Sequence, residues 1–395
     1  MPASWNELDS RAISTAKILA ADAVERVGNG HPGAAISLAP AAYALYQHHL
    51  HLDPSDPHWL GRDRFILSSG HSSLTQYLQL YLAGMGVELE DLKALRTEGA
   101  LTPGHPEFGH TPGVELTTGP LGTGLASAVG FAMAERFTHG LLDPDTPHGQ
   151  SIFDHCVYVI AGDGCLQEGV SAEASSLAGT QKLGNLIVLW DDNRISIEGD
   201  TDIAFSEDVL KRYESYGWHI QRVDWLSEDG SYVEDVQALD EALAAARDNT
   251  EQPSIIALRT IIGWPTPEKS NTGGIHGAKL GEEALRGLKS ALGADPDAHF
   301  AVDEEAVAHS RRQFAQRAQT LRDQWDQRFE EWKEANPQRA ALLERLLQDE
   351  LPEGWEKALP EFPAGKAIAT RSASGKVLNA IAPVLPELWG GSADL

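Results

Sequence analysis

Two short polar motifs, each at the end of an apolar run, could hold a divalent metal ion. Gly162-Asp163-Gly164 follows the first run, and Asp192-Asn193 follows the second. If the runs are neighbouring parallel strands, their carboxyl ends meet at one edge of a sheet, so we expect Asp163 and Asn193 to lie side by side. Mg²⁺ prefers about six oxygen ligands and commonly takes one or two from side chains, with phosphate and water supplying the rest.

Glycine and helix geometry would adapt such a metal site to a diphosphate. Gly162 and Gly164 would let the backbone approach a phosphate closely, and a helix expected from about Gly169 could direct N–H groups toward it. Each motif alone is more often a plain turn, because turns favour Gly, Asp and Asn. Two such motifs, each after a buried run and joined by a helical stretch, favour metal and diphosphate binding instead.

Four of the 15 histidines lie beside glycine in predicted loops. They are His31 in GNGHPG, His71 in SSGHSS, His105 in TPGHPEFGHTPGVE and His276 in GGIHGAKLG. A single loop histidine is usually an ordinary surface residue, but four in such settings are harder to dismiss. Imidazole can give and take protons near neutral pH, which suits reactions at hydroxyl and carbonyl oxygens. We therefore interpret these four histidines as candidate catalytic residues.

The elements that must position these residues are strands and helices in alternation. Apolar runs without polar alternation occupy residues 64–68, 156–161, 185–190 and 254–258. Helical spacing is found between them, for example at 11–27, 34–48, 126–137 and 170–183. This order predicts an α/β fold whose parallel sheet is covered by helices on both faces. The candidate residues would lie at the carboxyl ends of the strands, where such folds bind ligands.

Composition excludes several classes of function. The 395 residues include 31 basic and 58 acidic ones, a formal charge of -27, which argues against nucleic acid as a partner. No segment approaches the roughly 20 apolar residues of a membrane span, and residues 1–10 lack a signal-peptide pattern. We therefore expect a cytoplasmic protein with no membrane partner. Cys156 and Cys165 are interpreted as buried, reduced thiols.

The paired motifs and the residues between them, CLQEGVSAEASSLAGTQKLGNL, resemble the transketolase family of thiamine-diphosphate enzymes. The resemblance covers nearly all of residues 12–217, then 259–281 and 369–395, and is weaker over 285–363. It implies reversible transfer of a two-carbon ketol unit from a ketose phosphate of the xylulose 5-phosphate type to an aldose phosphate, in the pentose phosphate pathway. It also implies thiamine diphosphate, Mg²⁺ (or Ca²⁺ or Mn²⁺), and a homodimer with sites between subunits.

The resemblance assigns roles around the cofactor. Asp163, Asn193 and the backbone carbonyl of Ile195 would bind the metal. Glu168 would lie at the subunit interface. The alternative interpretation is that Glu168 is an exposed acidic residue favoured at the start of a helix by the helix dipole. The other expected cofactor contacts are Gly119 and Leu121 in the stretch 117–124, Gly162, Gly164, Ile197, His71, His276 and Asp394, the last reaching thiamine bound mainly by the neighbouring subunit.

The resemblance also assigns the substrate side. His31 and His276 would assist protonation at the reacting carbonyl oxygens, and His105 would bind the first hydroxyl of the donor. The GHPE histidine favours transketolase over the relative that makes deoxyxylulose phosphate. Arg371 would bind the sugar phosphate through paired hydrogen bonds. The alternative interpretation is that Arg371 is an ordinary solvated surface residue.

The resemblance also implies domain limits, and the chain departs from the family pattern at two places. Residues 1–335 would form the diphosphate domain, 336–363 a helical and Pro-rich connector, and 364–395 the start of a pyrimidine domain. We expect a truncated chain that is inactive alone, because the family's activating glutamate would follow Leu395. Asn29 replaces a common serine, a mild change, whereas prolines in the loop 263–267 could place His276 differently. Two rivals stay open: a formaldehyde-using relative that makes dihydroxyacetone, and a cofactor-binding fragment without catalysis.

Overall fold

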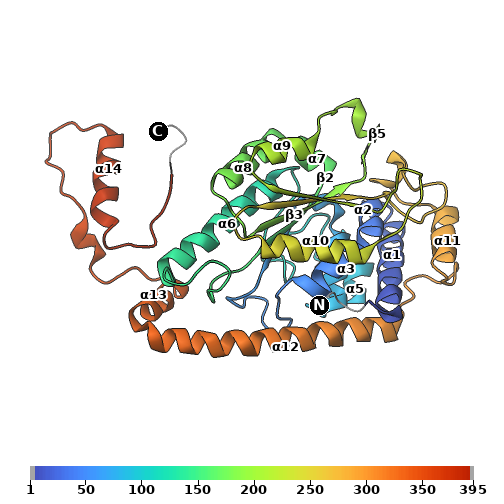
Figure 1. The fold of residues 1–395 in the computed structure, drawn as a ribbon, viewed down its shortest axis with the longest axis horizontal. Coiled ribbons are helices and arrows are strands. Elements are labelled where there is room, and N and C mark those ends of the chain that lie inside the picture. Colours follow the sequence, from blue (N-terminus) through green and yellow to red (C-terminus); the bar gives the residue numbers. More distant parts are fainter. Residues whose placement is uncertain (1–4, 392–395) are drawn as a thin grey trace. The chain divides into compact units, whose positions relative to one another are not determined.

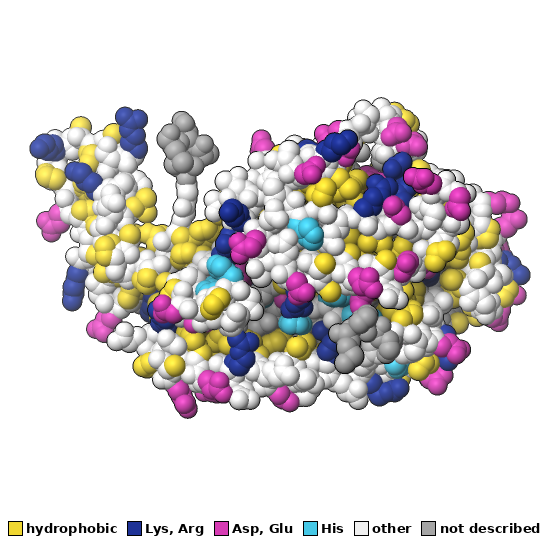
Figure 2. Space-filling model, in the orientation of Figure 1, with side chains coloured by type: hydrophobic (Ala, Val, Ile, Leu, Met, Phe, Trp, Pro, Cys, Tyr) yellow, Lys and Arg dark blue, Asp and Glu magenta, His cyan; other side chains and the backbone are white. Residues whose placement is uncertain are grey.

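The computed structural model describes residues 5–391, which divide into two compact units. Residues 1–135 and 154–324 belong to the first unit, and residues 136–153 and 325–395 to the second. The predicted domain limits at residues 335 and 363 stay predictions. Acidic side chains are spread widely over the face drawn in Figure 2, in keeping with the net charge of -27. Within residues 5–391, no helix combines the length and the apolarity that a membrane span needs.

A five-stranded sheet forms the centre of the first unit (Figure 1). Its strands, in spatial order, are β1 (Arg64–Leu67), β2 (Val157–Gly162), β3 (Leu186–Asp192), β7 (Ser254–Arg259) and β6 (His219–Asp224). Every neighbouring pair is parallel. The predicted parallel α/β fold is therefore confirmed. β6 was not predicted from the sequence, because this edge strand is only partly buried and carries polar residues.

Alternate residues of the strands pack into two separate hydrophobic clusters. Ile160 and Leu189 belong to one cluster, whereas Val159 and Val188 belong to the other. Because successive side chains of a strand point to opposite faces, this division means that both faces are buried. It explains why the strands read as continuous apolar runs without polar alternation.

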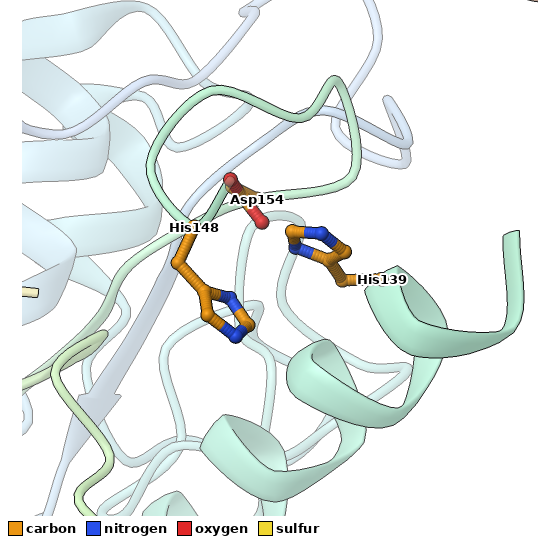
Figure 3. A group of neighbouring side chains, drawn as sticks. All are labelled: His139, His148 and Asp154. Carbon is orange, nitrogen blue, oxygen red and sulfur yellow. The ribbon is translucent and has the colours of Figure 1, made fainter. Parts of the chain in front are cut away.

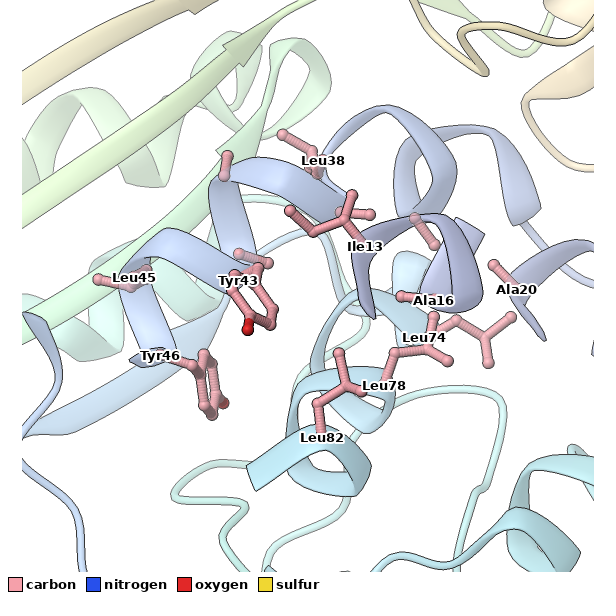
Figure 4. Close-up of a cluster of buried hydrophobic side chains, with 14 of the residues drawn as sticks. Ile13, Ala16, Ala20, Leu38, Tyr43, Leu45, Tyr46, Leu74, Leu78 and Leu82 are labelled. Atoms are coloured by element: carbon pink, nitrogen blue, oxygen red, sulfur yellow. The ribbon is translucent and has the colours of Figure 1, made fainter. Parts of the chain in front are cut away.

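The first cluster is built mainly by helices that precede β2 or follow β6. They are α1 (Glu7–Val27), α2 (Pro32–Ser37), α3 (Ala39–Ala44), α4 (Leu74–Ala83), α5 (Leu89–Lys93), α10 (Val236–Asp248) and α11 (Glu282–Ala291). Figure 4 draws part of this cluster, where Ile13 and Ala16 of α1 face Leu74 and Leu78 of α4. The second cluster involves α6 (Thr123–Leu142), α7 (Asp163–Gln167), α8 (Gly169–Thr180) and α9 (Val209–Ser215).

The helix expected over residues 34–48 is divided into three pieces. α2 ends at Ser37, α3 begins at Ala39, and a π-helical turn, η1 (Leu45–His49), follows. Pro40 at the start of α3 explains the first division, because proline has no N–H to continue the hydrogen bonds of α2. Short elements elsewhere in the first unit are η2 (Gly70–Ser72), β4 (Ile195–Ser196), β5 (Gly199–Asp200), η3 (Thr201–Ile203) and η4 (Gly273–Ile275).

The second unit contains the remaining helices. They are α12 (Glu304–Ala335) from Trp325 onward, α13 (Pro337–Leu347), η5 (Trp355–Ala358) and α14 (Thr370–Ile381). The α14 helix lies inside the predicted range 366–384, and no strand follows it up to residue 391. Near the end of α6, the rings of His139 and His148 lie 4.6 Å apart between centroids (Figure 3).

Candidate active site at the carboxyl ends of the strands

Asp163 lies directly after β2 and is hydrogen bonded to the end of β3. The indole Nε1 of Trp190 donates to its Oδ1 at 2.8 Å, and the backbone N–H of Arg194 donates to its Oδ2 at 2.8 Å. Because Arg194 follows Asn193 in the chain, the second bond brings the two polar motifs together. A cavity of about 570 Å³ opens beside Asp163, with Trp190 and Arg194 in its lining.

Asn193 is held by a neighbour in its own motif. Its Nδ2 donates to Oδ2 of Asp191 at 2.7 Å, and its Oδ1 accepts from the backbone N–H of Ile195 at 2.9 Å. Thr260 donates its hydroxyl to Oδ1 of Asp191 at 2.5 Å, which fixes that carboxylate from the neighbouring strand end. The orienting role of Asp191 was missed from the sequence, although its position just before Asp192-Asn193 was a signal.

The electrostatics of this strand edge favour a bound cation. Burial, together with the nearby carboxylates of Asp191 and Asp192, raises the pKa of Asp163 to about 7. Burial also raises the pKa of Asp191 to about 6. Several carboxylates that share one buried region repel each other, and a divalent ion would offset that repulsion. The oxygen donors present therefore fit a hard cation such as Mg²⁺.

Glycines let three loops approach each other next to this edge. Gly162 donates its N–H to Oγ of Ser69 at 2.7 Å. A Cβ added to Gly164 would come 3.0 Å from Cδ1 of Leu121, so a side chain there would force Leu121 to shift. A Cβ on Gly119 would meet the ring of His105 at 3.5 Å. Gly119 and Leu121, the predicted cofactor contacts in the stretch 117–124, thus lie close to the polar motifs that follow β1 and β2.

Three of the four candidate histidines form one cluster of rings. His31 precedes the first residue of α2, His71 lies in η2, and His276 follows η4. Ring centroids are 4.8 Å apart for His31 and His71, 5.2 Å for His71 and His276, and 5.7 Å for His31 and His276. The Pro-containing loop 263–267 therefore leaves His276 within the cluster.

The clustered histidines are neutral at pH 7. Burial, reinforced by the neighbouring imidazoles and the guanidinium of Arg96, lowers the pKa of His31 to about 4 and of His71 to about 3. Burial also lowers the pKa of His276 and of His105. The Nδ1 atom of His276 is buried without a hydrogen-bond partner among the described residues. A buried polar atom of this kind is expected to meet a polar ligand.

The remaining predicted residues are more dispersed. Ile195 lies in β4 opposite Asp200 of β5, and the nearby side chain of Ile197 is 67% exposed. Glu168 is an exposed residue just before α8, and a Cβ on Gly122 would touch it at 2.8 Å. Arg371 is exposed on α14 in the second unit, and Asp394 lies outside the described residues.

Known proteins match this chain over most of its length. Residues 8–352 match the family model described as "Transketolase, thiamine diphosphate binding domain". The transketolase of Mycobacterium tuberculosis is 57% identical over 395 residues, which is 100% of this chain and 55% of that protein. The transketolase of Geobacillus stearothermophilus is 45% identical over 390 residues, or 99% of this chain and 57% of that protein.

Solved structures agree with these matches. A transketolase from Pichia stipitis in complex with sedoheptulose 7-phosphate has a TM-score of 0.91 and 45% identity, covering 99% of this chain and 56% of that one. Transketolase from Leishmania mexicana has a TM-score of 0.90 and 40% identity, covering 98% and 56%. The chain thus spans about half the length of the relatives it matches. Sequence and fold together establish that this chain belongs to the transketolase family and contains its thiamine diphosphate binding domain.

Proposed function

We propose that the protein acts as a transketolase, moving a two-carbon ketol unit from a ketose phosphate to an aldose phosphate in the pentose phosphate pathway. One observation carries this proposal. The polar motifs after β2 and β3, joined by the bond from Arg194 to Asp163, lie at the same edge of the sheet as His71, which follows β1 and belongs to the cluster of three histidines. That combination supplies both a place for a metal diphosphate and groups able to manage protons on sugar oxygens.

Thiamine diphosphate and a divalent ion are the proposed cofactors. Asp163, the side chain of Asn193 and the carbonyl of Ile195 would bind Mg²⁺, or Ca²⁺ or Mn²⁺ in its place. Gly162 and Gly164 would accept the diphosphate at close range, since neither carries a side chain. When bound, thiamine diphosphate supplies the carbon nucleophile that lets a ketose release its two-carbon unit.

The residues of the chain would then bind, orient and exchange protons. His31 and His276, neutral and largely removed from water, are suited to donating a hydrogen bond to a carbonyl oxygen. His71 and His276 would also contact the diphosphate. Gly119 and Leu121 would contact the rest of the cofactor. His105 is only partly buried and is the most exposed of the four candidate histidines, which suits a residue that first meets the donor sugar.

Sugar phosphates are the proposed substrates. The Pichia stipitis relative was solved with sedoheptulose 7-phosphate, which supports a phosphorylated ketose for this chain as well. Arg371 is assigned to the substrate phosphate, because a guanidinium can bind phosphate oxygens through two parallel hydrogen bonds. A cytoplasmic location is part of the same proposal.

A homodimer is proposed on the basis of α8. The inner face of this helix buries Ser171, Ser175 and Ala178, whereas the apolar side chains of Val170 and Leu177 are 42% and 43% exposed. Val170 and Leu177 are separated by about two helical turns and therefore lie on one side of the helix. Apolar residues on the outer side, beginning next to Glu168, are suited to meeting the same helix of a second copy.

Ketol transfer from xylulose 5-phosphate to ribose 5-phosphate, measured with thiamine diphosphate and Mg²⁺, tests the proposed function. The assay compares this chain with an extended protein, in which the chain is continued by the remaining residues of the Mycobacterium tuberculosis relative. Turnover by the extended protein is expected. Transfer to formaldehyde in preference to ribose 5-phosphate would favour a dihydroxyacetone-forming enzyme. Tight cofactor binding without turnover in either protein would favour a non-catalytic module.

A further inference from the structure

The guanidinium of Arg96 contacts one of the three clustered imidazoles. Its Nη2 lies 3.3 Å from Nδ1 of His31, and its Nη1 donates to Oδ1 of Asn29 at 3.1 Å. Nη2 also lies 3.5 Å from the carbonyl oxygen of Gly104. One side chain, from the segment after α5, therefore joins the loop that carries His31 to the loop that carries His105.

The chemistry of this contact determines which nitrogen of His31 carries the proton. A guanidinium offers only donors and keeps its charge in proteins, so the ring nitrogen facing it must accept. A neutral imidazole has one donor and one acceptor nitrogen. Because Nδ1 of His31 faces Arg96, the proton belongs on Nε2. This nitrogen lies toward Gly277, where an added Cβ would come 3.2 Å from it.

The local backbone is shaped to hold Arg96 in place. Arg96 adopts a left-handed conformation with φ of 58°, and its N–H donates to the carbonyl of Thr102 at 2.9 Å. Its guanidinium packs against Gly104, where an added Cβ would come 3.1 Å from Nε. A larger residue in place of Gly104 would push the guanidinium away. The backbone of Arg96 and the packing against Gly104 thus both support the contact between Arg96 and His31.

We propose that Arg96 is a positioning residue that holds His31 as the neutral tautomer with its proton on Nε2. The inference deepens the proposed function, because His31 is one of the histidines assigned to the reacting carbonyl oxygen. In this tautomer His31 presents an N–H donor that needs no protonation of the ring. Asn29 adds an acceptor that fixes the other arm of the guanidinium.

The charged and titratable groups against His31 come from four segments: His71 of η2, His276 after η4, His105 of its loop, and Arg96. Of these, His276, Arg96 and His105 disfavour protonation of His31. Burial is the main cause of the low pKa of His31, and the neighbours add to it. Loss of Arg96 would remove one positive neighbour and leave burial unchanged. The expected rise in the pKa of His31 is therefore modest, about one unit or less.

Nuclear magnetic resonance of the ¹⁵N-histidine-labelled chain tests this proposal without cofactor or substrate. Long-range ¹⁵N–¹H correlations report which ring nitrogen is protonated, and a His31→Gln variant assigns the signals of His31. In the unsubstituted chain we expect a single tautomer with the proton on Nε2. Arg96→Met, which keeps the aliphatic stem but removes the donors, should give a mixture of tautomers and a raised pKa. Arg96→Lys should retain part of the effect.

A matched control removes a nearby charge that does not contact the ring. Lys93→Met, in α5, should leave the tautomer and the titration of His31 unchanged, since Lys93 pairs with Glu90 instead. A proton on Nδ1 in the unsubstituted chain overturns the proposal, even if Arg96→Met does not fold. Unaltered His31 signals in a folded Arg96→Met chain also overturn it. Failure of ketol transfer would concern the proposed function alone, because this measurement involves no turnover.

Discussion

The side-chain amide of Asn193 donates to the carboxylate of Asp191 at 2.7 Å, and this contact fixes the orientation of the amide. Its Oδ1 accepts from the backbone N–H of Ile195 and keeps a second lone pair for the proposed cation. Asp191 is itself fixed by the hydroxyl of Thr260. The proposed metal site would therefore depend on Asp191, a residue that need not touch the metal.

Asp191→Ala is expected to weaken Mg²⁺ binding, measured by calorimetry in the presence of thiamine diphosphate. Loss of an orienting partner behind a ligand typically reduces affinity about 10- to 100-fold. Asp229→Ala is the control, because Asp229 is an exposed turn residue bonded to Ser231. Equal affinities for the two variants would contradict the orienting role of Asp191.

Asp163→Ala is expected to abolish Mg²⁺-dependent binding of thiamine diphosphate. The change removes a proposed ligand itself. The loss of affinity should therefore exceed the roughly 100-fold loss expected when a residue that only orients a ligand is removed. Calorimetry with and without Mg²⁺ separates metal-dependent from residual binding. Circular dichroism controls for folding, and unchanged affinity in a folded variant would refute the assignment.

His105→Ala is expected to impair use of the donor sugar while cofactor binding stays normal. Loss of one hydrogen bond to the donor should lower kcat/KM about 10- to 100-fold in the extended protein. His110→Ala is a suitable comparison, since His110 is exposed in the same loop and contacts the carbonyl of Ala100. Donor kinetics that are equal in both variants would count against the role of His105.

His31 and His71 should contribute less to the stability of the folded chain as the pH falls from about 6.5 toward 4, while the raised pKa values of Asp163 and Asp191 act in the opposite direction. The unfolded chain protonates His31 and His71 at the ordinary pKa of 6.5, whereas burial lowers the folded values to about 4 and about 3. In this window the unfolded state binds more protons at these two histidines, so they favour unfolding as the pH falls. Urea titrations at several pH values measure the free energy of unfolding of the unsubstituted chain and of His71→Gln, which cannot titrate at this position. The stability of His71→Gln relative to the unsubstituted chain should rise as the pH falls; an identical pH dependence of the two would disagree.

Leu177→Glu is expected to weaken association of the chain with itself. The substitution introduces a charge on the outer side of α8, where a second copy is proposed to pack. Val233→Glu is the matched control, because Val233 is 66% exposed in the same unit but lies outside α8. Light scattering after gel filtration measures the mass, and dimers unaffected by Leu177→Glu would argue against this surface.

Local patterns predicted much of this architecture. The strands β1, β2, β3 and β7 were visible as apolar runs, because burial on both faces leaves a signature in consecutive residues. The polar motifs after β2 and β3 were visible for a similar reason, since turn and ligand residues directly follow those runs. β6 was missed because an edge strand is only partly buried and carries polar residues.

The sequence alone determined the α/β class, the strand-end motifs and the family of this protein. Only the tertiary structure decided that His31, His71 and His276 meet in one ring cluster, that Asp191 orients Asn193, and that Arg96 faces Nδ1 of His31. The physical reason is that the burial of a strand or helix determines the pattern of residues next to each other in the sequence. Contacts between distant loops depend instead on strand order and side-chain direction. Those are fixed only when the whole sheet and its covering helices pack together.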